Sequence, residues 1–265
     1  MSPYRADGKR ERPDVLLCAG LDPSGGAGLL ADTRIVAQLG ARPVGVVTAL
    51  TIQNTTGVLD THACDAEVVG QQLAFLMTDV EVRAVKIGML GSPELARAIA
   101  NALHLTNAPV VWDPVAAPSR GGGDYIATVA DSIAVLRPHL ALVTPNRDEL
   151  AVLANMPVED LASAEAAGAA IAAALDCAVL VKGGHLAGDE SIDVLISGRE
   201  RIELRAPRVE AGERVHGTGC ALASAIAAHL ALGRALPEAC RLAKAFVCER
   251  IAEPVAPGRG APAVV

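Results

Sequence analysis

The feature that most constrains the fold is a repeated alternation between short β-branched runs and amphipathic runs rich in alanine and leucine. Such alternation is typical of parallel βαβ units. It predicts strands over 14–20, 43–50, 84–87, 109–112, 140–144 and 177–181. It predicts helices over 27–39, 66–78, 93–104, 124–136, 147–154 and 162–174. We therefore expect a doubly wound, mostly parallel α/β sheet with helices on both faces.

The order changes near the C-terminus, where the sequence predicts a hairpin and two long helices. Strands over 191–196 and 201–206 flank a Ser-Gly turn, and helices follow over 217–232 and 237–252. Nothing between these elements resembles a linker. We expect a single domain over 14–252, with a polar tail over 1–13 and a C-terminal tail over 253–265.

The composition indicates a globular protein and argues against several kinds of partner. Of the 265 residues, 51% are apolar and 20% are charged, which is ample material for a core. The net charge of -7 is spread along the chain, so we expect no nucleic-acid partner. No segment reaches the roughly 18 apolar residues of a membrane helix, and no signal peptide is recognisable. We expect a cytoplasmic protein without a membrane partner.

Two glycine-rich segments follow expected strands and enter expected helices. The first reads GLDPSGGAG over 20–28, and glycines there would let the backbone approach a ligand closely. A turn without a ligand explains it equally well, and a solvated helix acid is the simpler interpretation of Asp32. The second reads HGTGC over 216–220, where free N–H groups and the helix dipole suit a phosphate. A plain capped helix start is the alternative.

Cys220 is the cysteine whose position predicts reactivity. A helix N-terminus lowers the pKa of a thiol, so we expect a thiolate at this position. The other five cysteines are scattered without a C-x-x-C pair, and we expect free thiols packed as small hydrophobic groups.

Two further segments follow strands and suit a phosphate-handling enzyme. Asn146 and Glu149 offer oxygen ligands that can hold magnesium through water, and Lys182 can contact phosphate as a point charge. Ligands of open α/β sheets bind beyond the carboxyl ends of strands, where both segments fall. The alternatives are a helix N-cap with a first-turn acid, and an ordinary turn lysine.

Six motifs carry a resemblance to a known family. They read DPSGGAG-x-x-AD over 22–32, TAL-x-x-QNT over 48–55, KIGML over 86–90, TPN over 144–146, KGGH over 182–185 and HGTGC over 216–220. With these, the chain resembles the hydroxymethylpyrimidine and phosphomethylpyrimidine kinases of the ribokinase-like superfamily, from about residue 14 to 251. The resemblance implies a ribokinase-like fold, a homodimer, and transfer of the γ-phosphoryl group of ATP, with Mg²⁺, in thiamine biosynthesis. The acceptor would be hydroxymethylpyrimidine and then its monophosphate.

The resemblance also assigns roles to residues of this chain. It implies a substrate site formed by Gly20, Ala27, Asp32, Gln53 and Val115, with Gln53 bonding the aminopyrimidine. It implies nucleotide contacts from Lys182, and magnesium support through water from Asn146 and Glu149. It implies an anion hole of Gly217, Thr218 and Gly219, with Cys220 as the catalytic base.

One loop departs from the family pattern and keeps two other functions open. The family usually has MLAKSG where this chain has AAPSRG over 116–121, so the customary lysine is missing. We predict that Arg120 supplies the positive charge to the nucleotide.

The first alternative function is a pyridoxal kinase built on the same scaffold, which Gln53 disfavours. The second is a degenerate sensor that binds a pyrimidine without phosphoryl transfer, which the altered loop motivates.

Overall fold

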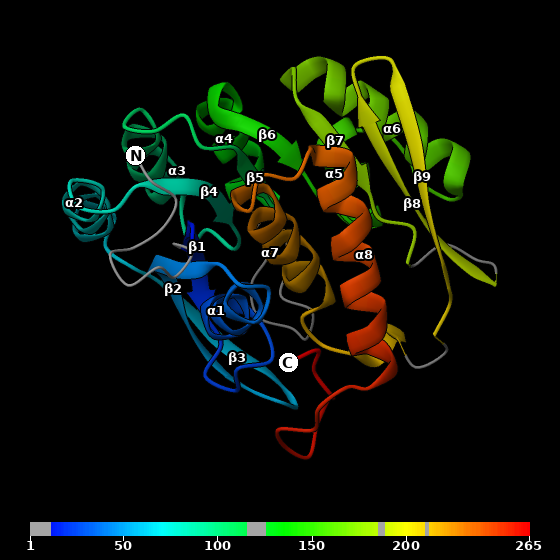
Figure 1. Cartoon of the computed structure of the whole chain (residues 1–265), viewed down its shortest axis with the longest axis horizontal. Helices are drawn as coiled ribbons and strands as arrows, with labels where there is room; N and C mark the ends of the chain where they lie inside the picture. The colour runs from blue at the N-terminus through cyan, green and yellow to red at the C-terminus, as the bar shows by residue number, and fades with distance from the viewer. Residues whose placement is uncertain (1–11, 116–125, 185–188, 210–211) are drawn as a thin grey trace.

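One mixed sheet forms the centre of the protein. The computed structural model describes residues 12–115, 126–184, 189–209 and 212–265. Within these residues, nine strands pair in the order β3-β2-β1-β4-β5-β6-β7-β8-β9 (Figure 1). The parallel strands are β1 (Asp14–Leu21), β2 (Arg42–Asn54), β4 (Val82–Ile87), β5 (Val110–Trp112), β6 (Leu140–Val143) and β7 (Ala178–Val181). The antiparallel strands are β3 (Gly57–Ala63), β8 (Glu190–Ser197) and β9 (Glu200–Pro207).

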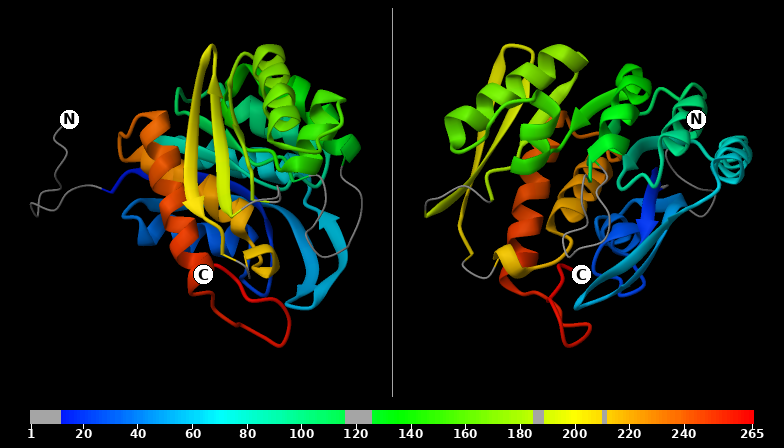
Figure 2. Two further views of the ribbon diagram at one scale, coloured as in Figure 1. Left: turned by 90° about the vertical axis from the view of Figure 1, so that its right-hand side faces the viewer. Right: turned by 180° about the vertical axis from the view of Figure 1, so that it is seen from behind.

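Helices cover both faces of the sheet, as the alternation predicts. On one face, toward the viewer in Figure 1, lie α1 (Gly28–Gln38), α7 (Thr218–Ala231) and α8 (Leu236–Ala252). The other face carries α2 (Ala66–Leu76), α3 (Pro93–Leu103), α4 (Ile126–Leu136), α5 (Arg147–Ala154) and α6 (Leu161–Leu175). Two short 3-10 turns, Arg137–His139 and Gly212–Arg214, complete the elements. Figure 2 shows the two helical layers from the side and from behind.

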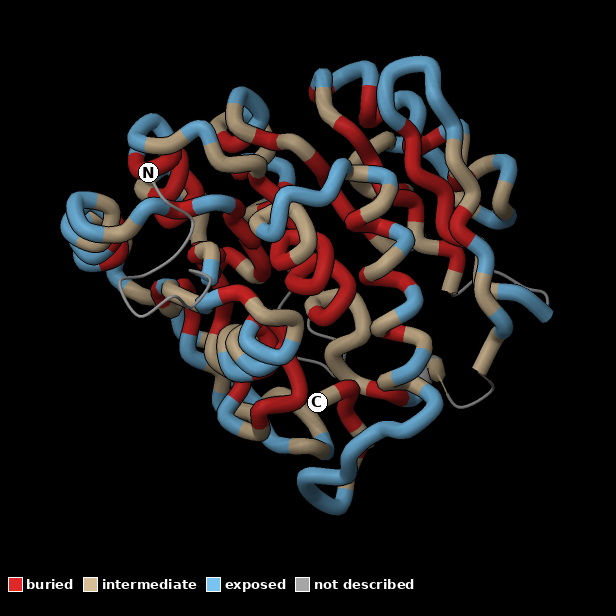
Figure 3. The backbone as a smooth tube through the Cα atoms, viewed as in Figure 1, coloured by how far each residue is buried: buried red, intermediate tan, exposed pale blue. Residues whose placement is uncertain are grey.

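The core consists of two apolar layers separated by the sheet. Successive residues of β1 point to opposite layers: Leu16 packs with the α2–α6 side, and Leu17 packs with α1, α7 and α8. Because both faces are covered, β1 carries no charged or polar side chain after Asp14, and nearly all of the strand is buried (Figure 3). Small alanines on the buried face of α7 fill the second layer, which compensates for the scarcity of aromatic residues.

The sequence did not predict the hairpin formed by β2 and β3. Strand β2 continues past Leu50 to Asn54, and β3 returns antiparallel to it with Gln53 opposite Val58. Most side chains of β3 are at least partly exposed, so its sequence lacks the alternation that marks a half-buried strand. The hairpin carries Gln53 on its inner face, and it therefore shapes the site described below.

The C-terminal residues 253–265, expected as a tail beyond the domain, pack back onto it. Ala261, Ala263 and Val264 are buried, and Ala261 N–H donates to the Thr55 carbonyl at 2.8 Å. Figures 1 and 2 show this red segment returning toward the β2–β3 hairpin. Within the described ranges, no helix has both the length and the apolar character required to span a membrane.

Candidate active site

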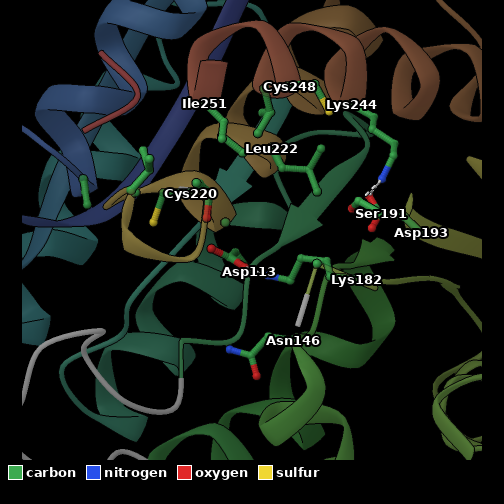
Figure 4. A pocket seen from close by; sticks show the side chains of 18 of the residues that line it. Asp113, Asn146, Lys182, Ser191, Asp193, Cys220, Leu222, Lys244, Cys248 and Ile251 are labelled. Atoms are coloured by element: carbon green, nitrogen blue, oxygen red, sulfur yellow. Dashed lines mark hydrogen bonds and ion pairs between the residues drawn. The ribbon is translucent and has the colours of Figure 1, made fainter. Parts of the chain in front are cut away.

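Two adjoining cavities open at the carboxyl ends of the parallel strands. The larger has a volume of about 260 Å³, and its polar lining includes Asp113, Asn146 and Lys182 (Figure 4). The smaller has a volume of about 70 Å³ and is lined by Gly20, Thr51, Gln53, Met89 and His216 among others. Both cavities share three lining residues: Ala27, Val115 and Cys220. Apart from Asp32 and Arg120, the site residues expected from separate motifs line these cavities at one end of the parallel strands, as the strand-end rule predicts.

The first turn of α7 lies at the junction of the cavities and has the geometry that suits an anion. Gly217 is the N-cap residue, with φ 83, and no side chain caps the helix start. A Cβ atom on Gly217 would lie 2.0 Å from the Gly26 carbonyl oxygen, so only glycine fits between the two loops. The uncapped N–H groups of Thr218 and Gly219 lie at the edge of the larger cavity, where they can bind a phosphate.

Lys182 lies beside this helix start and is held by a buried carboxylate. Its Nζ is 3.0 Å from Asp113 Oδ1, which also accepts a hydrogen bond from Thr144 Oγ1 at 3.2 Å. Burial alone would lower the pKa of Lys182, but the charges of Asp113 and Glu149 outweigh it and raise that pKa. The ammonium group is therefore charged. It lies 3.2 Å from the position that a Cβ of Gly219 would take.

Asn146 and Glu149 form a capping box at the start of α5. Asn146 Oδ1 accepts from the N–H groups of Asp148 and Glu149, each at 2.9 Å, and Glu149 Oε2 accepts from Asn146 N–H at 2.7 Å. The interpretation of these two residues as a helix N-cap and a first-turn acid is therefore correct. Both side chains also line the larger cavity, so their capping role leaves them beside any bound nucleotide.

Cys220 lies between the cavities, but the expected thiolate is wrong. Burial raises the pKa of Cys220 to about 12, against the lowering effect of the Lys86 charge and of a hydrogen bond from Gly28 N–H. The loss of solvation around the thiol outweighs the helix dipole and the nearby positive charge. All six cysteines are free, as expected.

Asp32 lines neither cavity and lies in a buried ion pair beneath them. Its Oδ2 is 2.6 Å from Lys86 Nζ, and its Oδ1 accepts from Ser224 Oγ at 2.7 Å. Both charged side chains are 0% exposed. Burial would lower the pKa of Lys86, but the negative charges of Asp32 and Asp113 outweigh burial and raise that pKa, so the ammonium is retained. Lys86, whose side chain reaches the smaller cavity, links this pair to the site.

Several residues that line the cavities were not singled out from the sequence. Asp113 follows β5 just as Asn146 and Lys182 follow β6 and β7, so the strand-end rule could have found it. Lys86 gave a signal as a charged residue inside an apolar parallel strand. Lys244 on α8 pairs with Asp193 at 2.9 Å in the lining of the larger cavity, and no sequence pattern indicates this contact. Arg120 lies outside the described residues, and its role stays a prediction.

This fold and site define a kinase of the ribokinase-like class, with two adjoining cavities that meet at a helix N-terminus. The family model for phosphomethylpyrimidine kinase matches residues 22–264, and the chain belongs to that family.

Similar proteins agree with this assignment. A hydroxymethylpyrimidine/phosphomethylpyrimidine kinase of Streptomyces coelicolor is 42% identical over 89% of this chain and 87% of its own length. The structure of Staphylococcus aureus pyridoxal kinase with ADP superposes with a TM-score of 0.87, at 27% identity, over 96% of this chain and 93% of that one. The phosphomethylpyrimidine kinase structure from Clostridium difficile gives 0.76 at 31% identity, over 91% of this chain and 100% of that one.

Proposed function

We propose that this protein is an ATP-dependent kinase that phosphorylates 4-amino-5-hydroxymethyl-2-methylpyrimidine and then its monophosphate, in thiamine biosynthesis. The observation that carries this proposal is the place of Cys220 and the 217–219 turn, where the two cavities meet. Phosphoryl transfer needs a donor on one side and an acceptor hydroxyl on the other, roughly in line. The larger cavity suits ATP, and the smaller one suits a single aromatic ring.

On the donor side, the phosphates of ATP bind at the start of α7. The backbone N–H groups of Thr218 and Gly219 and the ammonium group of Lys182 stabilise the charge of the transferring group. Asp113 holds Lys182 in place by the contact described above. Most of the rate enhancement comes from this positioning and charge stabilisation, because phosphoryl transfer requires little covalent participation by the protein.

On the acceptor side, Gln53 binds the aminopyrimidine edge while Gly20, Ala27 and Val115 shape the pocket. The hydroxymethyl group then points toward Cys220. As the hydroxyl oxygen attacks phosphorus, its proton passes to Sγ of the Cys220 thiolate, and ADP leaves with the electron pair of the broken bond. The thiolate is the minor form at neutral pH, and both Lys86 and Gly28 N–H favour it.

The larger cavity offers magnesium the oxygen atoms of Asn146 and Glu149, and Mg²⁺ prefers oxygen ligands while keeping several waters. Among the described residues, no group of three His, Cys, Asp or Glu side chains could hold a metal ion directly, which favours contact through water. Glu149 and Asn146 would hold the ion through water. Bound there, Mg²⁺ would neutralise charge on the β- and γ-phosphates.

Two features of the protein in the cell complete the proposal. We place it in the cytoplasm, and we infer a homodimer from the family resemblance. Leu50, Ile52 and Leu59 of the β2–β3 hairpin are 48%, 49% and 82% exposed, which gives a second copy an apolar surface to cover. Sedimentation analysis measures the mass in solution, and a monomer at micromolar concentration would contradict the dimer.

The second candidate function is phosphorylation of pyridoxal. The match to Staphylococcus aureus pyridoxal kinase favours it, because that fold superposes over 96% of this chain. A pyridine ring with a hydroxymethyl group also fits the smaller cavity.

A mass-resolved product assay with Mg-ATP tests these alternatives. Hydroxymethylpyrimidine, its monophosphate and pyridoxal are offered separately, and we expect pyrimidine monophosphate and diphosphate as products. Formation of pyridoxal phosphate alone would indicate that the protein is a pyridoxal kinase. Absence of product from every substrate would favour a sensor that binds without phosphoryl transfer.

A further inference from the structure

His216 makes contacts in the smaller cavity that the proposed reaction does not use. Its Nε2 lies 3.2 Å from Asp22 Oδ2 and 3.2 Å from the amide nitrogen of Gln53. The His216 side chain is 10% exposed, and its Nδ1 has no hydrogen-bond partner in the part of the chain that the structure describes. One ring nitrogen therefore contacts both a carboxylate and the group that is proposed to recognise the substrate.

Asp22 determines which nitrogen of His216 carries the proton. Its carboxylate already accepts from Ser24 N–H at 2.8 Å, from Ser24 Oγ at 2.7 Å and from Ala27 N–H at 3.1 Å. Burial would raise the pKa of Asp22, but hydrogen bonds from His216 and Ser24 lower it, so the group is a carboxylate. Because a carboxylate only accepts hydrogen bonds, His216 Nε2 must carry a hydrogen. The unpartnered Nδ1 is then an acceptor, which is less costly to bury than an unpaired N–H of an imidazolium.

The proton on His216 in turn determines the orientation of the Gln53 amide. If Gln53 Nε2 were the atom 3.2 Å from His216 Nε2, the N–H groups of both side chains would point at one another. The two ends of an amide have the same shape, and exchanging them places the carbonyl oxygen where it can accept from His216. We propose that Asp22 and His216 lock the Gln53 amide, with its oxygen toward His216 and its NH₂ group toward the ring of the bound substrate.

The lock predicts which hydrogen-bond donors and acceptors the substrate ring must present. This inference rests on the proposed function. The NH₂ group of Gln53 donates to an unprotonated ring nitrogen, while the second lone pair of its oxygen accepts from a neighbouring amino group. A 4-aminopyrimidine presents this pair. A 4-oxo analogue with an N3–H presents the inverse pattern, so it sets donor against donor and acceptor against acceptor. His216 is thus a positioning residue that determines specificity without contacting the reacting atoms.

The C-terminal segment holds the lock in position. His216 N–H donates to the Pro262 carbonyl at 2.8 Å, and Val264 N–H donates to the His216 carbonyl at 3.3 Å. The same segment bonds Thr55, two residues after Gln53, through Ala261 N–H at 2.8 Å. Residues 261–264 therefore hydrogen-bond both to His216 and to the strand end beside Gln53.

The test compares 4-amino-5-hydroxymethyl-2-methylpyrimidine with its 4-oxo analogue in His216→Leu, His216→Gln and wild type. Calorimetric binding gives the ratio of the two dissociation constants, and kcat/KM is measured beside it. We expect wild type to prefer the amino compound by on the order of 10³-fold, because a mismatched pair leaves buried polar groups unpaired. His216→Leu should reduce this preference at least about tenfold, since the amide can then turn. His216→Gln should retain it, because its amide nitrogen can replace the Nε2–H donor.

A second variant tests whether Gln53 donates to the ring. Gln53→Glu keeps the shape but places an acceptor where the lock puts the NH₂ group. Each compound then makes one matched and one mismatched contact with the carboxylate, so the preference for the amino compound should largely disappear. An unchanged preference in His216→Leu, or an unchanged amino preference in Gln53→Glu, would overturn the lock. Because the ratios come from binding, they decide the lock even if wild type forms no product, which is the outcome that would refute the proposed kinase.

Discussion

The buried Lys86–Asp32 pair offers the sharpest test of how the site is supported. Both side chains are fully buried, and the Nζ and Oδ2 atoms are 2.6 Å apart. Asp32→Asn removes the negative charge but keeps the shape and can keep the hydrogen bond from Ser224. It leaves a buried ammonium without its carboxylate, and removing one partner of such a pair costs about 3–5 kcal/mol.

This cost corresponds to a measurable shift in melting temperature. Unfolding entropy is about 2.1 cal/mol/K per residue, so a chain of 265 residues should lose about 5–9 °C. Differential scanning calorimetry at neutral pH measures the loss. The double variant Asp32→Asn with Lys86→Met should recover most of it, because a neutral pair needs no compensation.

An exposed ion pair provides the matched control. Glu94 and Arg97 on α3 are 3.1 Å apart, and each side chain is more than half exposed, so Glu94→Gln should leave the melting temperature unchanged. Two results would contradict a buried, charge-stabilised Lys86–Asp32 pair. One is an Asp32→Asn variant that melts within 1 °C of wild type, and the other is a double variant that melts below the single one.

Three further predictions concern the site itself. Alkylation of Cys220 by iodoacetamide should rise about tenfold per pH unit from pH 7 to 11, because its pKa is about 12; a plateau near pH 8.5 would contradict the raised pKa. Lys182→Met should lower kcat/KM for ATP by about 10²-fold without changing pyrimidine binding, and equal loss of pyrimidine affinity would argue against a donor-side role. Gly260→Ala should weaken pyrimidine binding and lower the melting temperature, since the new Cβ would lie 1.9 Å from the Thr55 carbonyl oxygen. Gly70→Ala on α2, with only an ordinary 3.7 Å contact, is its control and should do neither.

The parallel core of the fold could be predicted from the sequence because its strands are buried on both faces. Runs such as 110–112 and 140–143 are continuous and apolar, and they form β5 and β6. Strand β3 could not be predicted, because an exposed edge strand such as Gly57–Ala63 carries no apolar alternation. The packing of 261–264 was also hidden, since small and proline residues give no periodic signal.

The candidate site was predictable where its groups follow strands and unpredictable where they depend on packing. Asn146, Lys182 and the 217–219 turn follow from the rule that ligands bind beyond strand ends. The raised pKa of Cys220 does not follow from that rule, because it depends on desolvation by the surrounding tertiary structure and not on the position of the thiol in its own helix. The Asp22–His216–Gln53 contacts join segments separated by 163 and 194 positions along the chain, so no local pattern could reveal them.

The charges around the cavities explain why the proposal includes a cation in addition to ATP. Within the described ranges, each lysine that lines a cavity is paired with an aspartate: Lys86 with Asp32, Lys182 with Asp113 and Lys244 with Asp193. Glu149 adds a further carboxyl group to the larger cavity, so its lining has no excess of positive side chains. The backbone N–H groups of the 217–219 turn contribute only partial charge. A bound triphosphate therefore needs positive charge from elsewhere, which is the role proposed for Mg²⁺ and for Arg120.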